Sequence, residues 1–132
     1  MISSEAGDGY VMAKYAKMRD IDVTCVELYD EISGLAKRAR EELINVRFVV
    51  SQDFEFGRIS SSAVIIDAIF GIGLDRGIKE LGYSIISKIN ELANLKVSID
   101  MPTGLSSDNG EVLNFDKLKR RFRIKEVMGI CF

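Results

Sequence analysis

The chain has 132 residues, of which 47% are hydrophobic and 29% charged, and its formal net charge is -2 at pH 7. These values are typical of one globular domain, and they give no general attraction to nucleic acids or acidic membrane surfaces. The absence of histidine restricts proton transfer to carboxylate, Lys, Tyr or Cys side chains and excludes metal sites with imidazole ligands.

Two further features concern the cellular location. No apolar run approaches the roughly 18 to 20 residues of a membrane span, and the N-terminus lacks a basic segment followed by an apolar one. Cys25 and Cys131 are isolated thiols without CxxC or metal-ligand spacing, as expected for small buried hydrophobes in a reducing compartment. The sequence therefore predicts a cytoplasmic protein without a membrane segment.

The first helix is predicted to begin at Asp8 or Gly9, because apolar residues follow with the i, i+4, i+7 spacing of one helix face. These residues are Val11, Tyr15 and Met18. Residues 21–28 alternate at first and are rich in β-branched side chains, which predicts a strand. Asp30 is then the expected N-cap of a second helix, whose apolar stripe runs from Ile32 to Leu43.

Three more strands and one more helix are predicted in the rest of the chain. Residues 46–51 read as a strand, and residues 52–62 as a polar connection. The nearly continuous apolar run 63–70 is typical of a parallel strand covered on both faces. A glycine-rich loop leads to a helix at about residues 79–95, and residues 96–100 form the last clear strand.

This alternation of helices and strands predicts the fold class. It favours an α/β fold with a doubly wound, mostly parallel sheet and helices on both faces, in a three-layer αβα arrangement. The tail is ambiguous, because residues 117–125 hold six basic residues out of nine. They could form a nucleic-acid patch, but a solvated basic face or a partly ordered end is the favoured interpretation.

Polar features are predicted at the edge where parallel strands end, which is where such sheets bind ligands. One is Gly7-Asp8-Gly9 at a helix start, a second is Asp67 with the loop 71–77, and a third is Asp100 with Thr103 and Gly104. The glycine loop follows an apolar strand and precedes a helix, as a phosphate cradle does. Arg76 in that loop could add charge near a pyrophosphate or simply be solvated.

Asp67 interrupts an apolar run, where an unpaired buried carboxylate would cost several kcal/mol. It could be a structural residue that accepts backbone N–H bonds from the next loop, or it could hold a cation or a hydroxyl. Asp100 could likewise cap a turn, or face the same crevice as Asp67 if their strands are neighbours. The only proline, Pro102, fixes the backbone as the chain leaves this strand.

Three motifs in register resemble those of the NAD(P)HX epimerase family, also called the YjeF N-terminal domain. DAIFGIGLDRGI (67–78) is similar to the family's strand-end Asp followed by Phe-Gly-Thr-Gly-Leu and an arginine. SIDMPTGLSSDNGEV (98–112) is similar to its Asp-Ile-Pro-Ser-Gly-Leu segment with a downstream Asp-x-Gly-Glu. AGDGYVMAKY (6–15) is similar to the end of its Asn-Asn-Gly-Gly-Asp-Gly loop and the helix after it.

The resemblance implies a Rossmann-like fold and a cofactor-repair activity, the interconversion of the R and S epimers of hydrated NADH and NADPH. It also implies one potassium ion per subunit. Asp100 would be the catalytic or substrate-orienting carboxylate, and the metal ligands would be Glu5, Asp67 and Thr103. The residues expected at the substrate are Ser4, Glu5, Ala6, Gly7, Asp8, Gly71, Ile72, Gly73, Leu74, Asp75, Arg76, Gly77 and Asp100.

The sequence departs from the family pattern in two places. Ser4, Glu5 and Ala6 stand where the family has Asn-Asn-Gly. Only Met1 and Ile2 stand where the family has its first strand, so we expect residues 1–113 to form a domain that lacks this strand and the helices before it. The loss of a central strand would leave two strand edges unpaired. Residues 114–132 are expected to be a basic tail in which the family's later strands are not recognisable.

Two hypotheses of function follow from the resemblance. The first is an epimerase, an isomerase acting on NADHX and NADPHX, whose activity the truncation and the altered loop could impair. The alternative is a non-catalytic nucleotide-binding or protein-interaction module of the same fold. A homodimer is a possible assembly under either hypothesis, whereas membranes and nucleic acid are not expected partners.

Overall fold

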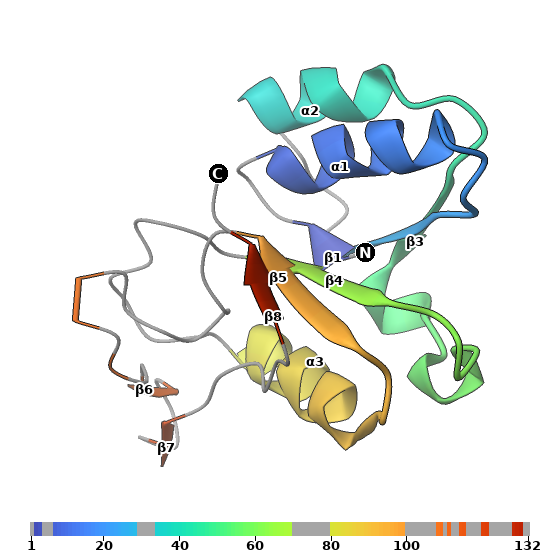
Figure 1. Cartoon of the computed structure of the whole chain (residues 1–132). Coiled ribbons are helices and arrows are strands. Elements are labelled where there is room, and N and C mark those ends of the chain that lie inside the picture. Colours follow the sequence, from blue (N-terminus) through green and yellow to red (C-terminus); the bar gives the residue numbers. More distant parts are fainter. Residues whose placement is uncertain are drawn as a thin grey trace.

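The computed structural model describes residues 2–3, 7–28, 34–69, 80–99, 108–109, 111, 114–115, 120–121 and 128–130 (Figure 1). Within these residues, a six-stranded sheet has the order β3-β2-β1-β4-β5-β8, and its neighbouring strands are parallel. Its strands are β1 (Ile2–Ser3), β2 (Thr24–Glu27), β3 (Arg47–Val50), β4 (Ile65–Ala68), β5 (Lys96–Ile99) and β8 (Met128–Ile130). The predicted α/β class and parallel pairing are therefore confirmed.

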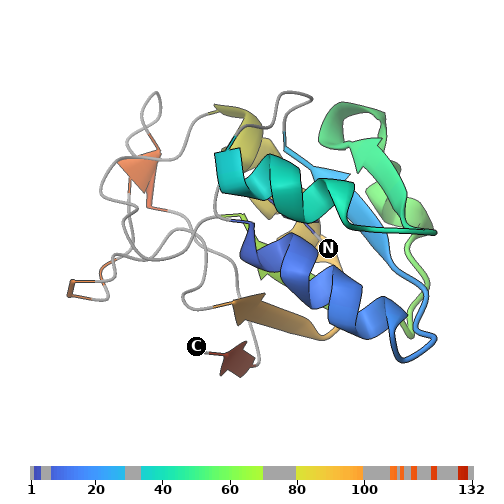
Figure 2. The ribbon, with the colours of Figure 1, turned by 90° about the horizontal axis from the view of Figure 1, so that it is seen from above.

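The helices are α1 (Asp8–Lys17), α2 (Gly34–Glu41) and α3 (Glu80–Glu91), with two 3-10 turns, η1 (Ser51–Asp53) and η2 (Phe56–Arg58). Figure 1 shows α1 and α2 on one side of the sheet and α3 on the other, and Figure 2 shows α1 and α2 side by side. A separate antiparallel pair joins β6 (Asn114–Phe115) and β7 (Arg120–Arg121).

The predicted helices and strands are each found, mostly with shorter bounds. Helix α1 begins at Asp8 as expected. The six predicted strands and helices that follow it overlap, in chain order, β2, α2, β3, β4, α3 and β5. Residues 52–62, predicted as a connection, contain turn η2 and part of η1. Asp30, the expected N-cap of α2, lies outside the described residues.

The centre of the sheet differs from the expectation of two unpaired strand edges. Ile2 and Ser3 form strand β1, which lies between β2 and β4. Ile2 is aligned with Val26 on one side and with Asp67 on the other. A further strand, β8, pairs with β5 in the region predicted as a tail. Two residues are too few to show a hydrophobic period, which is why the sequence did not predict β1.

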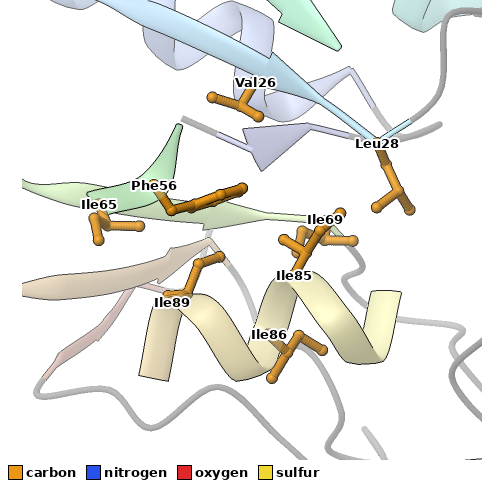
Figure 3. Close-up of a cluster of buried hydrophobic side chains, with 8 residues drawn as sticks. All are labelled: Val26, Leu28, Phe56, Ile65, Ile69, Ile85, Ile86 and Ile89. Carbon is orange, nitrogen blue, oxygen red and sulfur yellow. The ribbon is translucent and has the colours of Figure 1, made fainter. Parts of the chain in front are cut away.

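Apolar side chains gather on both sides of the sheet. On the side of α3, Figure 3 shows Ile85, Ile86 and Ile89 of the helix with Phe56 and strand residues. The full cluster is Val26, Leu28, Phe56, Ile65, Ile69, Ile85, Ile86 and Ile89. On the other side, a second cluster lies between α1, α2 and β2 and consists of Tyr10, Ala13, Cys25 and Ala36. Each large buried side chain contributes roughly 1.5–3 kcal/mol relative to exposure, so these clusters stabilise the helix positions.

Helix α1 packs through a face other than the apolar stripe that predicted it. Its buried residues are Gly9, Tyr10 and Ala13. The stripe that predicted the helix is exposed, with fractions of 45% for Val11, 56% for Tyr15 and 69% for Met18. The buried face has one large side chain, Tyr10, beside two small residues that let the helix approach its neighbours closely. This face has no apolar repeat of its own, so the apolar spacing predicts the helix but not the face that it buries.

Candidate functional site

The carboxylate of Asp67 is buried near the end of β4, where its side chain is 1% exposed. Its Oδ1 accepts a hydrogen bond of 3.3 Å from the backbone N–H of Ile69, and its Oδ2 accepts one of 2.9 Å from the Ser98 hydroxyl. Hydrogen bonds to the ionised form offset the cost of burying a carboxylate. Asp67 thus accepts one backbone N–H bond from directly after its own strand, as the structural interpretation predicts, and one hydroxyl bond from the neighbouring strand. A role of Asp67 in holding a ligand stays a prediction.

Ser98 is a site residue that the sequence analysis missed. It lies in the buried strand β5, directly opposite Asp67 of β4, and is 0% exposed. Neighbouring parallel strands bring the two side chains together although they are 31 positions apart in the chain. The available signal was a hydroxyl within the apolar run Lys96–Ile99, two positions before Asp100.

The start of α1 supplies the second described part of the candidate site. Gly7 is the N-cap and has a φ of 79°, in the left-handed region that favours glycine. A β-carbon at Gly7 would lie 3.4 Å from the Cα of Ala36, an ordinary van der Waals contact with α2. Asp8 is exposed in the first turn, where its charge interacts favourably with the positive end of the helix dipole.

The sheet register brings the ends of β1, β4 and β5 to one edge. Ser3 is aligned with Ala68, and Asp67 with Ser98. These three parallel strands therefore end at the same edge of the sheet, and each is followed in the sequence by a segment that holds predicted site residues. The predicted site residues within those segments lie outside the described residues: Ser4, Glu5, Ala6, Gly71, Ile72, Gly73, Leu74, Asp75, Arg76, Gly77, Asp100 and Thr103.

A second polar cluster, which we call the Glu27 cluster, comprises the buried residues Tyr10 and Glu27 and the half-buried Arg40. Glu27 is the last residue of β2 and is 4% exposed. Its Oε1 accepts hydrogen bonds from the Tyr10 hydroxyl at 2.9 Å and from Arg40 Nε at 2.5 Å. No specific prediction for this cluster followed from the sequence, although a glutamate inside an apolar strand signals a buried partner.

Two findings concern ligands and membranes. Within the described ranges, no group of three or more His, Cys, Asp or Glu residues could hold a metal ion. The carboxylate oxygens of Asp67 are nevertheless of the kind that hard cations take as ligands. Among the helices of the described part, none combines the length and apolar character needed to cross a bilayer.

A known family model matches most of the chain. The family model described as YjeF-related protein N-terminus matches residues 3–124. The chain belongs to this family. The match begins at Ser3, within β1, and includes β2 through β7, together with Asp67, Ser98 and the Glu27 cluster.

Curated relatives carry names from cofactor repair. The NAD(P)H-hydrate epimerase of Limosilactobacillus reuteri is 28% identical over 110 residues, which cover 83% of this chain and 52% of the relative. The NAD(P)H-hydrate epimerase of Oenococcus oeni is 32% identical over a match that covers 85% of this chain and 53% of the relative. The bifunctional NAD(P)H-hydrate repair enzyme Nnr of Vibrio cholerae is 33% identical over 81% of this chain and 22% of its own. The chain thus spans about half the length of the epimerases it matches.

Proposed function

We propose that the chain is an NAD(P)HX epimerase, which interconverts the R and S epimers of hydrated NADH and NADPH. Membership of the YjeF N-terminal family and the names of the relatives support this activity. The observation that carries the proposal is the buried pair Asp67 and Ser98 at the sheet edge from which the matched loops leave. The proposal includes a cytoplasmic location and a possible homodimer.

The proposed architecture is a Rossmann-like, doubly wound sheet in three αβα layers. The strand order β3-β2-β1-β4-β5-β8 agrees with the 3-2-1-4-5-6 order of dinucleotide-binding sheets. Helices on the two sides of the sheet are consistent with three layers. In such sheets, the ligand crevice lies where the strand order reverses, beside β1 and β4. The domain boundary at residue 113 remains a prediction.

In the proposed mechanism, carboxylates perform the proton transfer, since the chain has no histidine. Asp100 would remove or return a proton at the hydrated ring, or orient that ring. Residues 71–77 would hold the cofactor phosphates through backbone N–H groups. Glu5, Asp67 and Thr103 would hold a potassium ion, which when bound supplies positive charge among these oxygen donors.

The test is epimerisation of chirally enriched NADHX by the purified full chain, measured by the approach of the R and S forms to equilibrium. We expect catalysis that depends on potassium and that falls at least a hundredfold in Asp100→Asn. Normal turnover by Asp100→Asn would remove that residue from the catalytic role. Choline chloride at equal ionic strength is the control for the salt effect.

The altered loop favours a second candidate function. Ser4, Glu5 and Ala6 replace Asn-Asn-Gly, and a glutamate changes both the charge and the reach of the oxygen donor. A non-catalytic nucleotide-binding or protein-interaction module would bind NADP⁺ or NADPHX without epimerising the hydrate. Binding by calorimetry together with no turnover by the wild type would favour this module over the enzyme.

A further inference from the structure

The Glu27 cluster links α1 and α2 through a buried carboxylate. Tyr10 of α1 and Arg40 of α2 both donate to Oε1 of Glu27, and Arg40 Nη2 also donates to Oε2 at 3.4 Å. Tyr10 is 1% exposed, and the Glu27 side chain is 5% exposed. A buried carboxylate that loses a charged partner is left with a large desolvation cost, so the three side chains depend on one another.

Arg40 is held from both sides. Its guanidinium lies 4.1 Å from the ring centroid of Phe48 in β3, which is a cation–π contact. The hydrogen bond from its guanidinium to Glu27 raises the pKa of Arg40 above its ordinary value, so the side chain stays charged at any working pH. Arg40 therefore links α2 to Glu27 of β2 and to Phe48 of β3.

The same cluster reaches the start of α1, where two of the proposed substrate-binding residues lie. Tyr10 belongs to the first turn, and the backbone N–H groups of Tyr10 and Val11 donate to the carbonyl of Gly7 at 3.1 and 3.2 Å. Gly7 also lies close to Ala36 of α2, as shown by the 3.4 Å that would separate its β-carbon from the Ala36 Cα. Helix α2 thus contacts this turn through its backbone and, by way of Glu27, through Arg40.

We propose that Arg40 is a positioning residue which, through Glu27 and Tyr10, holds the first turn of α1 in the orientation that substrate binding requires. The inference rests on the proposed function, because that function assigns Gly7 and Asp8 to the substrate. A loop fixed in its bound conformation loses less entropy when the ligand binds. Loss of Arg40 should therefore raise KM more than it lowers kcat.

The experiment uses the full chain and three variants. Arg40→Met removes the guanidinium, and the double variant Glu27→Gln with Arg40→Met also removes the carboxylate charge that would otherwise be orphaned. Lys14→Met is the matched control, because Lys14 forms an exposed 2.7 Å ion pair with Glu42 next to the C-terminal end of α2. Native-state hydrogen exchange measures the protection of the Tyr10 and Val11 amides separately from that of the other amides.

We expect exchange of the Tyr10 and Val11 amides to be at least fivefold faster in Arg40→Met and in the double variant. Amides of α3 in the double variant and all amides in Lys14→Met should stay within twofold of wild type. In the epimerisation assay, KM should rise at least fivefold in the double variant while kcat falls less than twofold.

Two results would overturn the proposal. One is exchange of the Tyr10 and Val11 amides at the wild-type rate in the double variant. Any faster exchange in Arg40→Met would then come only from the unpaired charge of Glu27. The other is accelerated exchange with an unchanged KM in an active double variant. If the wild type itself does not epimerise NADHX, the proposed function fails, and the exchange of these two amides still decides whether Arg40 holds the turn.

Discussion

Ser98 donates a 2.9 Å hydrogen bond to Asp67 across two neighbouring parallel strands, and neither side chain is more than 1% exposed. The bond joins β4 to β5 and adds to the one that the carboxylate accepts from the Ile69 N–H directly after β4. The pair is thus a product of the sheet register, at the edge where the family's loops begin.

Ser98→Ala should lower the free energy of unfolding by about 1.5–3 kcal/mol, because it removes a buried hydrogen bond to a charged acceptor. Urea denaturation measures this loss. Ser51→Ala is the matched control, since its buried hydroxyl donates to the neutral carbonyl of Leu28 at 3.1 Å and should contribute about 1 kcal/mol. Equal losses of unfolding free energy in the two variants would show that the bond to the Asp67 carboxylate is no stronger than a bond to a neutral carbonyl.

Gly7→Ala should destabilise the fold by roughly 1–2 kcal/mol, through its backbone conformation rather than through lack of space. The φ of Gly7 is 79°, whereas an added β-carbon would be only in ordinary contact with Ala36. Gly7→Asn should cost less, because asparagine tolerates the left-handed region better. Gly57→Ala is the control in open space and should be close to neutral in urea denaturation. Equal losses from alanine and asparagine at Gly7 would contradict the conformational explanation.

Lys96→Met should destabilise the end of α3. Lys96 is 7% exposed, and its ammonium donates to the carbonyls of Leu92 at 2.6 Å and Asn94 at 3.1 Å. Loss of these two hydrogen bonds from a charged donor should cost about 1–3 kcal/mol in thermal or urea unfolding. Lys88→Met removes an exposed lysine that lies 5.7 Å from the Phe56 ring centroid, and it should cost under about 1 kcal/mol. A larger effect at Lys88 would reverse this ranking.

Cys25 should react slowly with thiol reagents in the folded protein. Burial raises the pKa of its thiol to about 11, so the thiolate is scarce at neutral pH. The unfolded chain ionises this thiol at lower pH than the folded chain, so its contribution to stability is full below about pH 9 and is lost as pH rises toward 11.

Alkylation kinetics in a Cys131→Ser background test this assignment of Cys25. The rate should keep rising above pH 9 and should increase sharply in urea. A rate that levels off near pH 8.5 in the folded protein would contradict the raised pKa.

The sequence predicted well those elements whose side chains repeat with a clear period. The apolar run 63–70 gave β4, and the carboxylate that interrupts it, Asp67, marked the sheet edge. The buried face of α1 was not predicted, because the apolar repeat of Val11, Tyr15 and Met18 lies on the exposed side, whereas the helix buries Gly9, Tyr10 and Ala13. The partnership of Glu27 with Arg40 depends on how β2 and α2 meet in space, which no local pattern encodes.

The brevity of β1 has a consequence for how the protein unfolds. Two residues join β2 and β3 on one side to β4 and β5 on the other, so few ladder bonds cross this seam. Val26 and Leu28 belong to the same apolar cluster as Ile65 and Ile89, and this packing bridges the seam on the α3 side. Because few ladder bonds join the two halves, the α1–β2–α2–β3 half and the half built on α3 should separate as cooperative units once this apolar packing is lost. Such a separation would begin beside the loop on which substrate binding is proposed to depend.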